Sequence, residues 1–364
     1  MKIDGVPHRT IWPAEDGAGV EVIDQTVLPH AFEVRRLSRW QDAARAISTM
    51  VVRGAPLIGA TAAWGMALAA RADASDTALA EAAAALVASR PTAVNLRWAV
   101  EAMQRTLQPL SPADRADTAY AEAARICDAE VAACEAIGEY GEALVRERYD
   151  GREPVQVLTH CNAGWLAAVD WGMSLAPVYK AHDAGVPVHV WVDETRPRNQ
   201  GAALTAWELK AHGVPHTVVV DNAGGHLMQH GRVDLCIVGS DRVAANGDVC
   251  NKIGTYLKAL AAHDNGVPFF AALPSSTIDW RLAHGRDIPI EERDEAEVTH
   301  ISGLGPDGQM TSVRVTPEGA RAANFGFDVT PARLVTAIIT ERGVCDASSA
   351  GLAGLFPDLA EAAA

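Results

Sequence analysis

The chain has 364 residues, enough for about two domains, and 49% of them are hydrophobic, as in folded globular proteins. Its 31 basic and 46 acidic side chains give a net charge of −15, which excludes a broad basic surface for nucleic acid or for an anionic membrane. An anionic ligand must therefore be bound by a few local cations.

The sequence indicates neither export nor a membrane span. Residues 1–17 lack the apolar core of a signal peptide. The uncharged stretch 54–70 contains glycine, proline and threonine and is shorter than the roughly 20 mostly apolar residues that cross a bilayer. We expect a buried helix there. The six cysteines form no CxxC pair, so we expect reduced thiols in a cytoplasmic protein.

The first 150 residues have a mainly helical pattern. Alanine-rich stretches at 76–89 and 118–149 repeat apolar residues every three or four positions, and one or two short strands are expected within 19–32. A turn signal at Asp150 and Gly151 ends this pattern. We therefore expect a helical N-terminal domain over residues 1–150 and a second domain over residues 151–364.

The second domain contains a series of short apolar runs, most of them separated by enough chain for a helix. They lie at 155–160, 188–193, 216–221, 235–241 and 269–274, and most are rich in β-branched residues. This alternation is typical of βαβ units and of a parallel sheet buried on both faces. The predicted fold class is α/β: a helical N-terminal domain plus a doubly wound, Rossmann-like parallel-sheet domain.

Three histidines precede a glycine and a proline just before predicted strands. His182, His212 and His263 are therefore expected near helix C-termini, where a polar or cationic ring is favoured. We interpret them as structural residues, not as ligands of a metal or substrate.

Each apolar run is followed by a compact polar cluster. These clusters lie at 160–164, 193–197, 221–225, 239–242 and 274–277. Because parallel strands end at the same edge of a sheet, and because ligands bind at that edge, five clusters together indicate a binding site. A single cluster is better explained by helix caps and turns.

Two residues in these clusters suggest acid–base chemistry. Cys161 follows a strand and precedes Asn-Ala-Gly, so a following helix could lower the pKa of its thiol, although inert buried cysteine is the alternative. Asp241 ends an apolar strand, where partial desolvation raises the pKa of a carboxyl toward that of a useful general acid.

Two segments could bind phosphate. Residues 53–56, Arg-Gly-Ala-Pro, enter the apolar helix and present free backbone N–H groups beside a guanidinium. Residues 246–255 place a turn, an amide and Lys252 at a predicted helix start. Helix capping alone is the alternative at both places.

Other motifs point away from cofactors. Residues 303–308 match GxGxxG, but they contain proline and lead into a strand or hairpin where a dinucleotide fingerprint needs a helix. The sequence has no HExxH motif, no CxxC pair and no GxxxxGK[ST] loop. We therefore expect no nicotinamide, flavin, metal or nucleoside triphosphate cofactor.

The sequence resembles the methylthioribose-1-phosphate isomerase family over nearly its whole length. The motifs that carry the resemblance lie at 52–63, 89–99, 160–164, 193–209, 239–256, 287–294 and 327–343. That family is related to regulatory subunits of the translation initiation exchange factor and to ribose-1,5-bisphosphate isomerase. The resemblance implies a cytoplasmic homodimer that acts on a sugar phosphate in methionine salvage, without a cofactor, nucleic acid or membrane.

Carried over position by position, the resemblance also implies roles for single residues. Asp241 becomes the general acid, and Cys161 becomes the thiol that stabilises the transition state or handles a proton. The substrate-binding residues become Arg53, Gly54, Ala55, Arg90, Gln200, Asn251 and Lys252. Ser240, Ile278 and residues 324–326 depart from the usual family pattern, which leaves the shape of the pocket around the 5-substituent open.

The implied reaction converts 5-methylthioribose 1-phosphate to 5-methylthioribulose 1-phosphate. An acid opens the ring, and hydrogen moves from C2 to C1 either as a hydride or through a phosphoenolate. We favour the hydride shift because a dry, apolar pocket suits it. The alternatives are an isomerase for 5-deoxyribose 1-phosphate or ribose 1,5-bisphosphate, and a non-catalytic regulatory subunit.

Overall fold

The computed structural model describes residues 1–3, 5–90 and 93–363, so Pro91 and Thr92 of the 89–99 motif lie outside the described residues. The N-terminal part begins with a hairpin and a three-stranded antiparallel sheet. Their strands are β1 (Lys2–Ile3), β2 (Val6–Pro7), β3 (Ile11–Pro13), β4 (Val20–Ile23) and β5 (Val34–Leu37). The strand expected within 19–32 is β4, and β3 and β5 extend it into a sheet.

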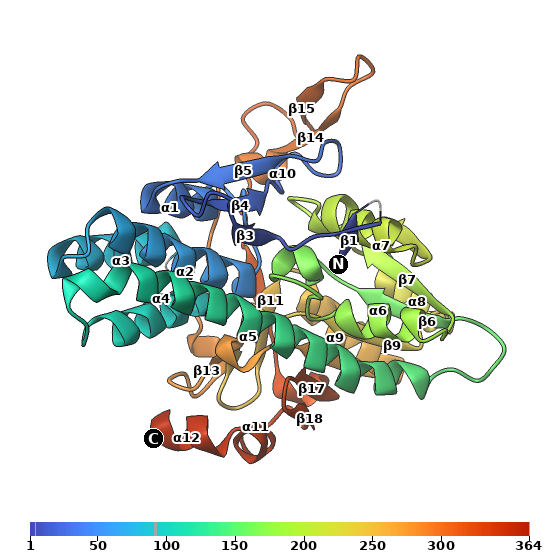
Figure 1. Ribbon diagram of the computed structural model, residues 1–364. Helices are drawn as coiled ribbons and strands as arrows, with labels where there is room; N and C mark the ends of the chain where they lie inside the picture. Colours follow the sequence, from blue (N-terminus) through green and yellow to red (C-terminus); the bar gives the residue numbers. More distant parts are fainter. Residues whose placement is uncertain (4, 91–92, 364) are drawn as a thin grey trace.

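Five helices follow, as the sequence predicted (Figure 1). They are α1 (Trp40–Ser48), α2 (Ala55–Ala72), α3 (Asp76–Ser89), α4 (Val94–Leu107) and α5 (Pro112–Arg146). Helix α2 is buried on every side from Ala55 to Ala70 and packs against α1, α3, α4 and α5. This confirms the buried helix expected at 54–70. Among the residues that the structure describes, no helix combines the length and apolarity that a bilayer crossing requires.

Helix α5 connects the two parts of the molecule. Its first half packs in the core of the helical part, and its second half packs under the central sheet (Figure 1). Gly138 and Gly141 permit this second contact, because a Cβ on Gly141 would lie 2.4 Å from the Pro177 ring. Since one helix belongs to both cores, the domain boundary at residue 150 stays a prediction.

The central sheet has seven strands in the order β18-β17-β12-β9-β6-β7-β8. All neighbouring pairs are parallel except β17 with β18. The strands are β6 (Val155–Thr159), β7 (Val188–Asp193), β8 (His216–Val219), β9 (Leu235–Val238), β12 (Phe269–Ala272), β17 (Ala337–Thr340) and β18 (Gly343–Cys345). The five predicted strands are confirmed, and β17 and β18 were not among the predicted runs.

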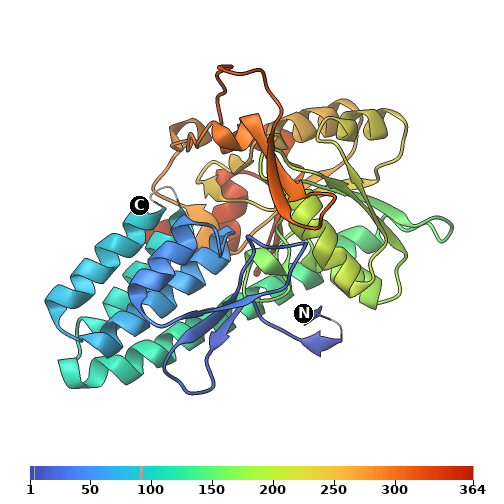
Figure 2. The same cartoon turned by 90° about the horizontal axis from the view of Figure 1, so that it is seen from above.

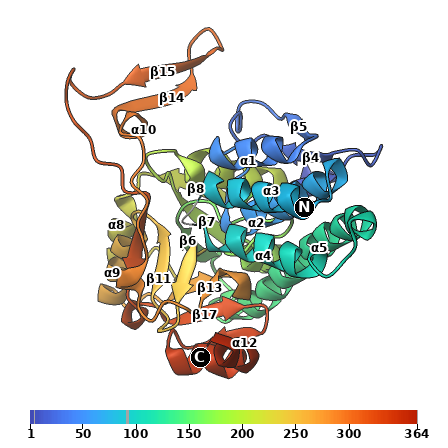
Figure 3. The same ribbon diagram turned by 90° about the vertical axis from the view of Figure 1, so that its left-hand side faces the viewer.

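Helices cover both faces of this sheet. One face packs on α5, α6 (Ala176–Asp183) and α7 (Ala206–His212), and the other packs on α8 (Ala223–Gln229) and α9 (Thr255–Asp264). Alternate strand residues supply the two cores: Val157 and Ile237 face the first, whereas Leu158 and Val238 face the second. Figure 3 shows α8 and α9 on one side and α5 on the other. The sheet is doubly wound, as predicted.

The strand order fixes where a ligand binds. Counted along the chain, the six parallel strands stand in the order 3-2-1-4-5-6 from β8 to β17, so the winding reverses between β6 and β9. In doubly wound sheets the ligand crevice lies at this switch point, beyond the carboxyl ends of the strands. Those two ends lead directly into residues 160–164 and 239–241.

A second sheet lies beside the switch point. Its order is β13-β10-β11-β16, from β10 (Arg242–Ala244), β11 (Val249–Lys252), β13 (Ile278–Asp279) and β16 (Phe327–Thr330). The sequence placed Asn251 and Lys252 at a helix start. They instead end strand β11, and helix α9 begins three residues after Lys252. The apolar residues Val249 and Cys250 before them pair with β10 and β16, which holds the segment in the sheet.

The remaining elements are short. They are η1 (Trp165–Ala167), η2 (Gly201–Thr205), η3 (Ser275–Thr277), η4 (Gly285–Asp287), α10 (Ala296–Thr299), β14 (His300–Leu304), β15 (Met310–Arg314), η5 (Ala332–Leu334), α11 (Ser349–Leu355) and α12 (Pro357–Ala363). Residues 303–308 lie in the β14–β15 hairpin, as expected when the dinucleotide fingerprint was rejected. The hairpin lies above the junction between the helical part and the sheet (Figure 2).

Candidate active site

One cavity brings together all nine residues predicted for the site. Its empty volume is about 480 Å³, and it opens at the switch point of the central sheet. The predicted residues that line it are Arg53, Gly54, Ala55, Arg90, Cys161, Gln200, Asp241, Asn251 and Lys252. Met50, Asn162, Ala163, Ala167, Met173, Ser240 and Phe327 complete the lining.

The N-terminus of α2 forms one wall. Gly54 precedes the helix with φ 92°, and no side chain among the described residues caps this helix end. A Cβ on Gly54 would lie 2.5 Å from Cα of Ala167, so only glycine lets the helix start approach η1 so closely. The uncapped N–H groups of the first turn are thereby available to an anion.

Arg53 is held rigidly beside this helix end. Its Nη1 donates to the amide oxygen of Asn162, and its Nη2 donates to the backbone oxygen of Asn162 at 2.8 Å. Asn162 in turn donates from Nδ2 to Glu208 at 2.8 Å and to Thr205 at 3.2 Å. The Arg53 guanidinium therefore enters the cavity in one orientation, which suits it to bind a phosphate.

Cys161 lies on the loop after β6 in a strained backbone conformation. Its φ is 68°, which is uncommon for a residue with a Cβ. The loop is fixed because Cys161 N donates to the Thr195 hydroxyl at 2.8 Å and the Thr205 hydroxyl donates to Cys161 O at 2.7 Å. Such a fixed loop aims the thiol into the cavity.

The prediction that a following helix lowers the pKa of the Cys161 thiol is wrong. Burial raises the pKa of Cys161, and the positive charges of Arg53 and Lys252 oppose the rise without cancelling it. The helix expected after Asn162 is η1, a single turn from Trp165 to Ala167, so it supplies little dipole. The thiol is therefore protonated near neutral pH.

Asp241 lies between β9 and β10, where its backbone N–H donates to Cys250 O at 2.9 Å. Burial raises the pKa of its carboxyl, whereas the charges of Lys252, Arg90 and Arg53 oppose the rise. This is the direction expected from the sequence. A raised pKa favours the protonated form of the carboxyl, from which a proton can pass to a ligand in the cavity.

Lys252 and Asn251 approach from the second sheet. The Lys252 ammonium lies 4.5 Å from the centre of the Phe327 ring, and burial lowers its pKa against the opposing effect of Cys161 and Asp241. Asn251 donates from Nδ2 to the Thr255 hydroxyl at 3.0 Å. Both side chains are more than nine-tenths buried, so the protein fixes them before any ligand binds.

Two predicted residues have polar atoms without a partner. The side-chain oxygen of Gln200 and Nε of Arg90 are buried, and neither forms a hydrogen bond within the described residues. Arg90 also pairs with Glu291 at 3.5 Å through Nη2. Buried polar atoms without partners are costly, so these two atoms are suited to ligand hydroxyl or phosphate oxygens.

The sequence interpretation missed two residues that hold the cavity wall in place: Asn162, which lines the cavity, and Glu208, which lies behind it. Asn162 was noted only as part of a polar cluster, and Glu208 was not singled out. Glu208 accepts hydrogen bonds from Asn162, from Trp165 N at 2.9 Å, from Leu166 N at 3.0 Å and from the Tyr179 hydroxyl at 2.9 Å. Burial raises the pKa of Glu208 to about 7 against the effect of these donors. A carboxylate four residues after Leu204 in an apolar run was the available signal.

The fold and the cavity are those of a protein that binds a small anionic ligand and can transfer a proton to it. Three basic side chains, an uncapped helix end, a carboxylic acid and a thiol meet at the switch point of a doubly wound sheet. They suit a small anionic ligand and proton transfer to it.

Comparisons with known proteins identify the family. Residues 51–347 match the Initiation factor 2 subunit family, to which the chain belongs. The chain is 66% identical to a methylthioribose-1-phosphate isomerase from Methylorubrum extorquens over all of both chains. It is 63% identical to one from Paramagnetospirillum magneticum over 99% of this chain and 100% of the relative. These matches place it among the methylthioribose-1-phosphate isomerases, which confirms the resemblance.

Solved structures agree with this placement. A 5-methylthioribose 1-phosphate isomerase from Pyrococcus horikoshii is 38% identical with a TM-score of 0.83, covering 97% of this chain and 96% of that one. A translation initiation factor eIF-2B delta subunit from A. fulgidus is 37% identical with a TM-score of 0.79, covering 96% of this chain and 100% of that one.

Proposed function

We propose that the protein is an aldose–ketose isomerase that converts 5-methylthioribose 1-phosphate to 5-methylthioribulose 1-phosphate in methionine salvage. The names of its full-length relatives support this activity. The observation that carries the proposal is the juxtaposition of a raised-pKa acid, Asp241, with a neutral thiol, Cys161, and three cations around one cavity. We further propose that the enzyme is cytoplasmic and homodimeric.

The phosphate binds where the cations converge. Arg53 and Lys252 flank the uncapped N-terminus of α2, so charge-assisted hydrogen bonds and free N–H groups meet one anion. Gln200, Asn251 and Arg90 surround the rest of the cavity, where the sugar hydroxyls lie. The net charge of −15 makes this local group of cations the attraction for the substrate.

Asp241 opens the ring. The anomeric oxygen of the substrate carries phosphate, so the sugar does not open spontaneously to a free aldehyde. Protonation of the ring oxygen by Asp241 breaks the C1–O bond and leaves C1 electron-deficient. The carboxyl suits this role because burial raises its pKa.

The hydrogen then moves from C2 to C1 with its electron pair. The C2 hydroxyl becomes the ketone and loses its proton, which overall replaces the proton that Asp241 gave to the ring oxygen. Cys161 lies at this hydroxyl as a neutral thiol and shapes the field around it. A protonated thiol is a poor base for the C2 hydrogen, which favours the hydride shift over the phosphoenolate route.

A second cavity adjoins the first beside Asp241. Its empty volume is about 400 Å³, and both cavities share Ala55, Arg90, Asp241 and Phe327. Ile58, Ala93, Arg242, Cys250, Ile288 and Pro289 complete its lining. The 5-substituent is attached to C5, and C5 is attached to C4, the carbon bonded to the ring oxygen, so the group that protonates this oxygen lies close to the 5-substituent. The second cavity therefore receives the methylthio group.

The charges around this second cavity argue against a 5-phosphate. Arg90 pairs with Glu291 at 3.5 Å, and Arg242 pairs with Asp279 at 3.6 Å, so nearby carboxylates already compensate both guanidinium groups. Ile58, Ala93, Ile288 and Pro289 offer apolar surface. A methylthio group suits this lining better than the dianion of ribose 1,5-bisphosphate does.

Substrate preference tests the second cavity. Ile288→Ala is expected to lower the kcat/KM ratio of 5-methylthioribose 1-phosphate to 5-deoxyribose 1-phosphate about tenfold, since an apolar group of this size is worth roughly 1–3 kcal/mol. Ile290→Ala, two residues away at a side chain that is 38% exposed, is the matched control and should leave the ratio unchanged. An unchanged ratio in Ile288→Ala would place the methylthio group elsewhere.

Turnover tests the function itself. The purified chain is incubated with 5-methylthioribose 1-phosphate, ketose is measured, and 5-deoxyribose 1-phosphate and ribose 1,5-bisphosphate are run in parallel. Ketose from the methylthio substrate at the highest kcat/KM supports the proposal. Binding without turnover of all three would instead support a regulatory subunit, the alternative favoured by the likeness to the delta subunit. Light scattering on the same sample tests the homodimer.

A further inference from the structure

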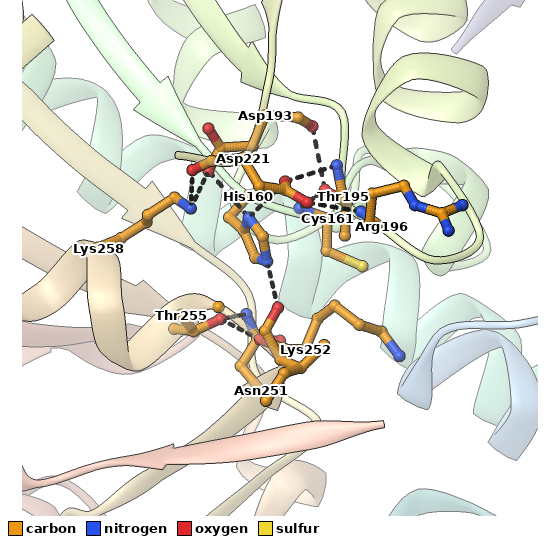
Figure 4. A network of polar contacts seen from close by, with 12 residues as sticks. His160, Cys161, Asp193, Thr195, Arg196, Asp221, Asn251, Lys252, Thr255 and Lys258 are labelled. Atoms are coloured by element: carbon orange, nitrogen blue, oxygen red, sulfur yellow. Dashed lines mark hydrogen bonds and ion pairs between the residues drawn. The ribbon is translucent and has the colours of Figure 1, made fainter. Parts of the chain in front are cut away.

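A buried charged network lies directly behind the active-site loop. His160 is 1% exposed, and its ring lies between two acceptors (Figure 4). Its Nδ1 is 2.9 Å from an oxygen of Asp193, and its Nε2 is 2.8 Å from the backbone oxygen of Ile253. The proposed reaction uses none of these groups.

The hydrogen-bond partners of His160 hold its ring in one orientation. A backbone carbonyl only accepts, so Nε2 donates to Ile253. The Asp193 oxygen that faces Nδ1 also lies 3.2 Å from the Lys258 ammonium.

Lys258 belongs to the same network. His160, Asp193 and Asp221 could together hold a metal ion, since their ligand atoms lie within 4.8 Å of one another. The Lys258 ammonium pairs with Asp193 and also donates to the backbone oxygen of Asp221. Lys258 therefore places a positive charge beside the Asp193 carboxylate.

The network joins two segments of the active site. His160 directly precedes Cys161, and Ile253 directly follows Lys252. The ring therefore links the loop after β6, which carries the thiol, to the end of β11, which carries the phosphate-binding cation. Figure 4 shows the Cys161 sulfur and the Lys252 side chain on the side away from Asp193.

A second connection holds the same loop. Asp221 accepts from the backbone N–H groups of Thr195 at 2.8 Å and of Arg196 at 2.7 Å. The Thr195 hydroxyl accepts from Cys161 N at 2.8 Å. Both Cys161 and Thr195 have positive φ, with values of 68° and 65°, and such conformations persist only where surrounding contacts impose them.

We propose that His160 is a positioning residue that fixes the Cys161 thiol relative to the Lys252 ammonium, with Asp193 and Lys258 holding its ring. Its kinetic consequences rest on the proposed function. A buried ion network is a costly way to stabilise a fold, because well-packed apolar side chains serve as well. Its value here is geometric: one rigid ring spans two segments that are 93 residues apart in sequence.

Two substitutions separate the two bonds of the ring. His160→Asn keeps a donor near the Nδ1 position and loses the bond to Ile253, whereas His160→Gln keeps a donor near the Nε2 position. His189→Asn is the matched control. His189 is a histidine of the same sheet whose ring nitrogens contact Gln156 at 3.1 Å and Thr217 at 3.0 Å, at the opposite end of β6.

The kinetic result expected is a split between variants. In His160→Asn, KM for the sugar phosphate should rise and kcat should fall, each at least tenfold per folded enzyme, and His160→Gln should recover most of the KM effect. His189→Asn should change neither constant. If all three variants lose thermal stability but retain wild-type kcat and KM per folded enzyme, the network only stabilises the fold and the proposal fails.

A readout without turnover keeps the two proposals separate. The enzyme is treated with iodoacetamide at alkaline pH, where part of the Cys161 thiol is ionised, in the presence of increasing inorganic phosphate. The alkylated Cys161 peptide is measured by mass spectrometry. The phosphate concentration for half-protection should rise at least tenfold in His160→Asn and remain at the wild-type value in His189→Asn. Equal half-protection in His160→Asn and wild type would overturn the positioning role. Failure of wild type to isomerise the sugar phosphate would reject only the proposed function.

Discussion

Arg53 and Asn162 are joined by two hydrogen bonds, one to the side-chain oxygen and one to the backbone oxygen of Asn162, the latter at 2.8 Å. Asn162 can accept in this way because its amide nitrogen is committed to Glu208 at 2.8 Å. The carboxylate of Glu208 thus fixes the amide, and the amide fixes the guanidinium. The orientation of Arg53, the arginine proposed to bind the phosphate, is therefore set by Glu208, which does not line the cavity.

This relay can be tested by removing its middle member. Asn162→Ala is expected to weaken binding of the sugar phosphate about tenfold, since a hydrogen bond to a charged group is worth roughly 1.5–3 kcal/mol. Arg53→Ala should weaken binding at least as much. Asn265→Ala, which removes an amide at the end of α9, is the control. The affinities are measured by titration calorimetry with a substrate analogue that lacks the C2 hydrogen and so cannot isomerise. Wild-type affinity in Asn162→Ala would show that Asn162 does not orient Arg53.

The two proposed catalytic side chains predict large losses in turnover. Cys161→Ser and Asp241→Asn should each lower kcat by at least a hundredfold and alter substrate affinity much less, because both groups act mainly in the transition state. Both substitutions preserve side-chain size, so the thermal midpoint should stay close to that of wild type. Steady-state kinetics and calorimetry check this. Turnover near wild type in either variant would remove that residue from the mechanism.

The pH dependence of Asp241 follows from its surroundings. A general acid works only while protonated, so kcat/KM should fall as pH rises through the pKa of Asp241, which burial raises. The charge of Lys252 lowers that pKa and the charge of Glu291 raises it. Lys252→Met should therefore move the alkaline limb of the kcat/KM profile to higher pH, and Glu291→Gln should move it to lower pH.

Each of these two variants is a control for the other. Both remove one charge, but the expected shifts of the alkaline limb are in opposite directions. The profile of kcat/KM is measured with each, since it reports on the free enzyme. A shift in the same direction for both, or no shift in either, would show that another group sets the limb.

The sequence predicted five of the seven strands of the central sheet and nine residues of the cavity lining. Continuous apolar runs such as 155–160 are typical of parallel strands that are buried on both faces of a sheet. The carboxyl ends of parallel strands share one edge of the sheet. That is why Cys161 and Asp241, which are 80 positions apart, meet at the switch point. Arg53, Gly54, Ala55, Asn251 and Lys252 lie in the two segments predicted to bind phosphate, whereas Arg90 and Gln200 came from the family resemblance alone. The structure places all seven in the same cavity.

The residues that hold the site residues in place could not be predicted from the apolar runs. His160 contacts Ile253 across 93 positions and Glu208 contacts Asn162 across 46, and no local pattern encodes such pairings. The helix expected after Cys161 fails for a local reason. Gly172, with φ 85°, lies so close to Gly164 that a Cβ would be 2.2 Å from its carbonyl carbon, so the segment folds back on itself.

The route of the C2 hydrogen separates the two mechanisms. With deuterium at C2 of the substrate, a hydride shift delivers the label to C1 of the product. Unlabelled substrate in D₂O then gives product with essentially no carbon-bound deuterium. Isotope content is measured by NMR and mass spectrometry. The structural reason for this expectation is that burial raises the pKa of Cys161, while Asp241 is already assigned to the ring oxygen.

A phosphoenolate route predicts the reverse outcome. A base that has taken the C2 proton can exchange it with water before returning it, so label would wash out to solvent. Cys161→Ser provides the discriminating control, because a hydroxyl is a weaker base than a thiolate but contacts the C2 hydroxyl in a similar way. Under a hydride shift, the residual turnover of Cys161→Ser should retain the label as fully as wild type does. Extensive washout in wild type that disappears in Cys161→Ser would make the thiolate the base and would overturn the hydride mechanism.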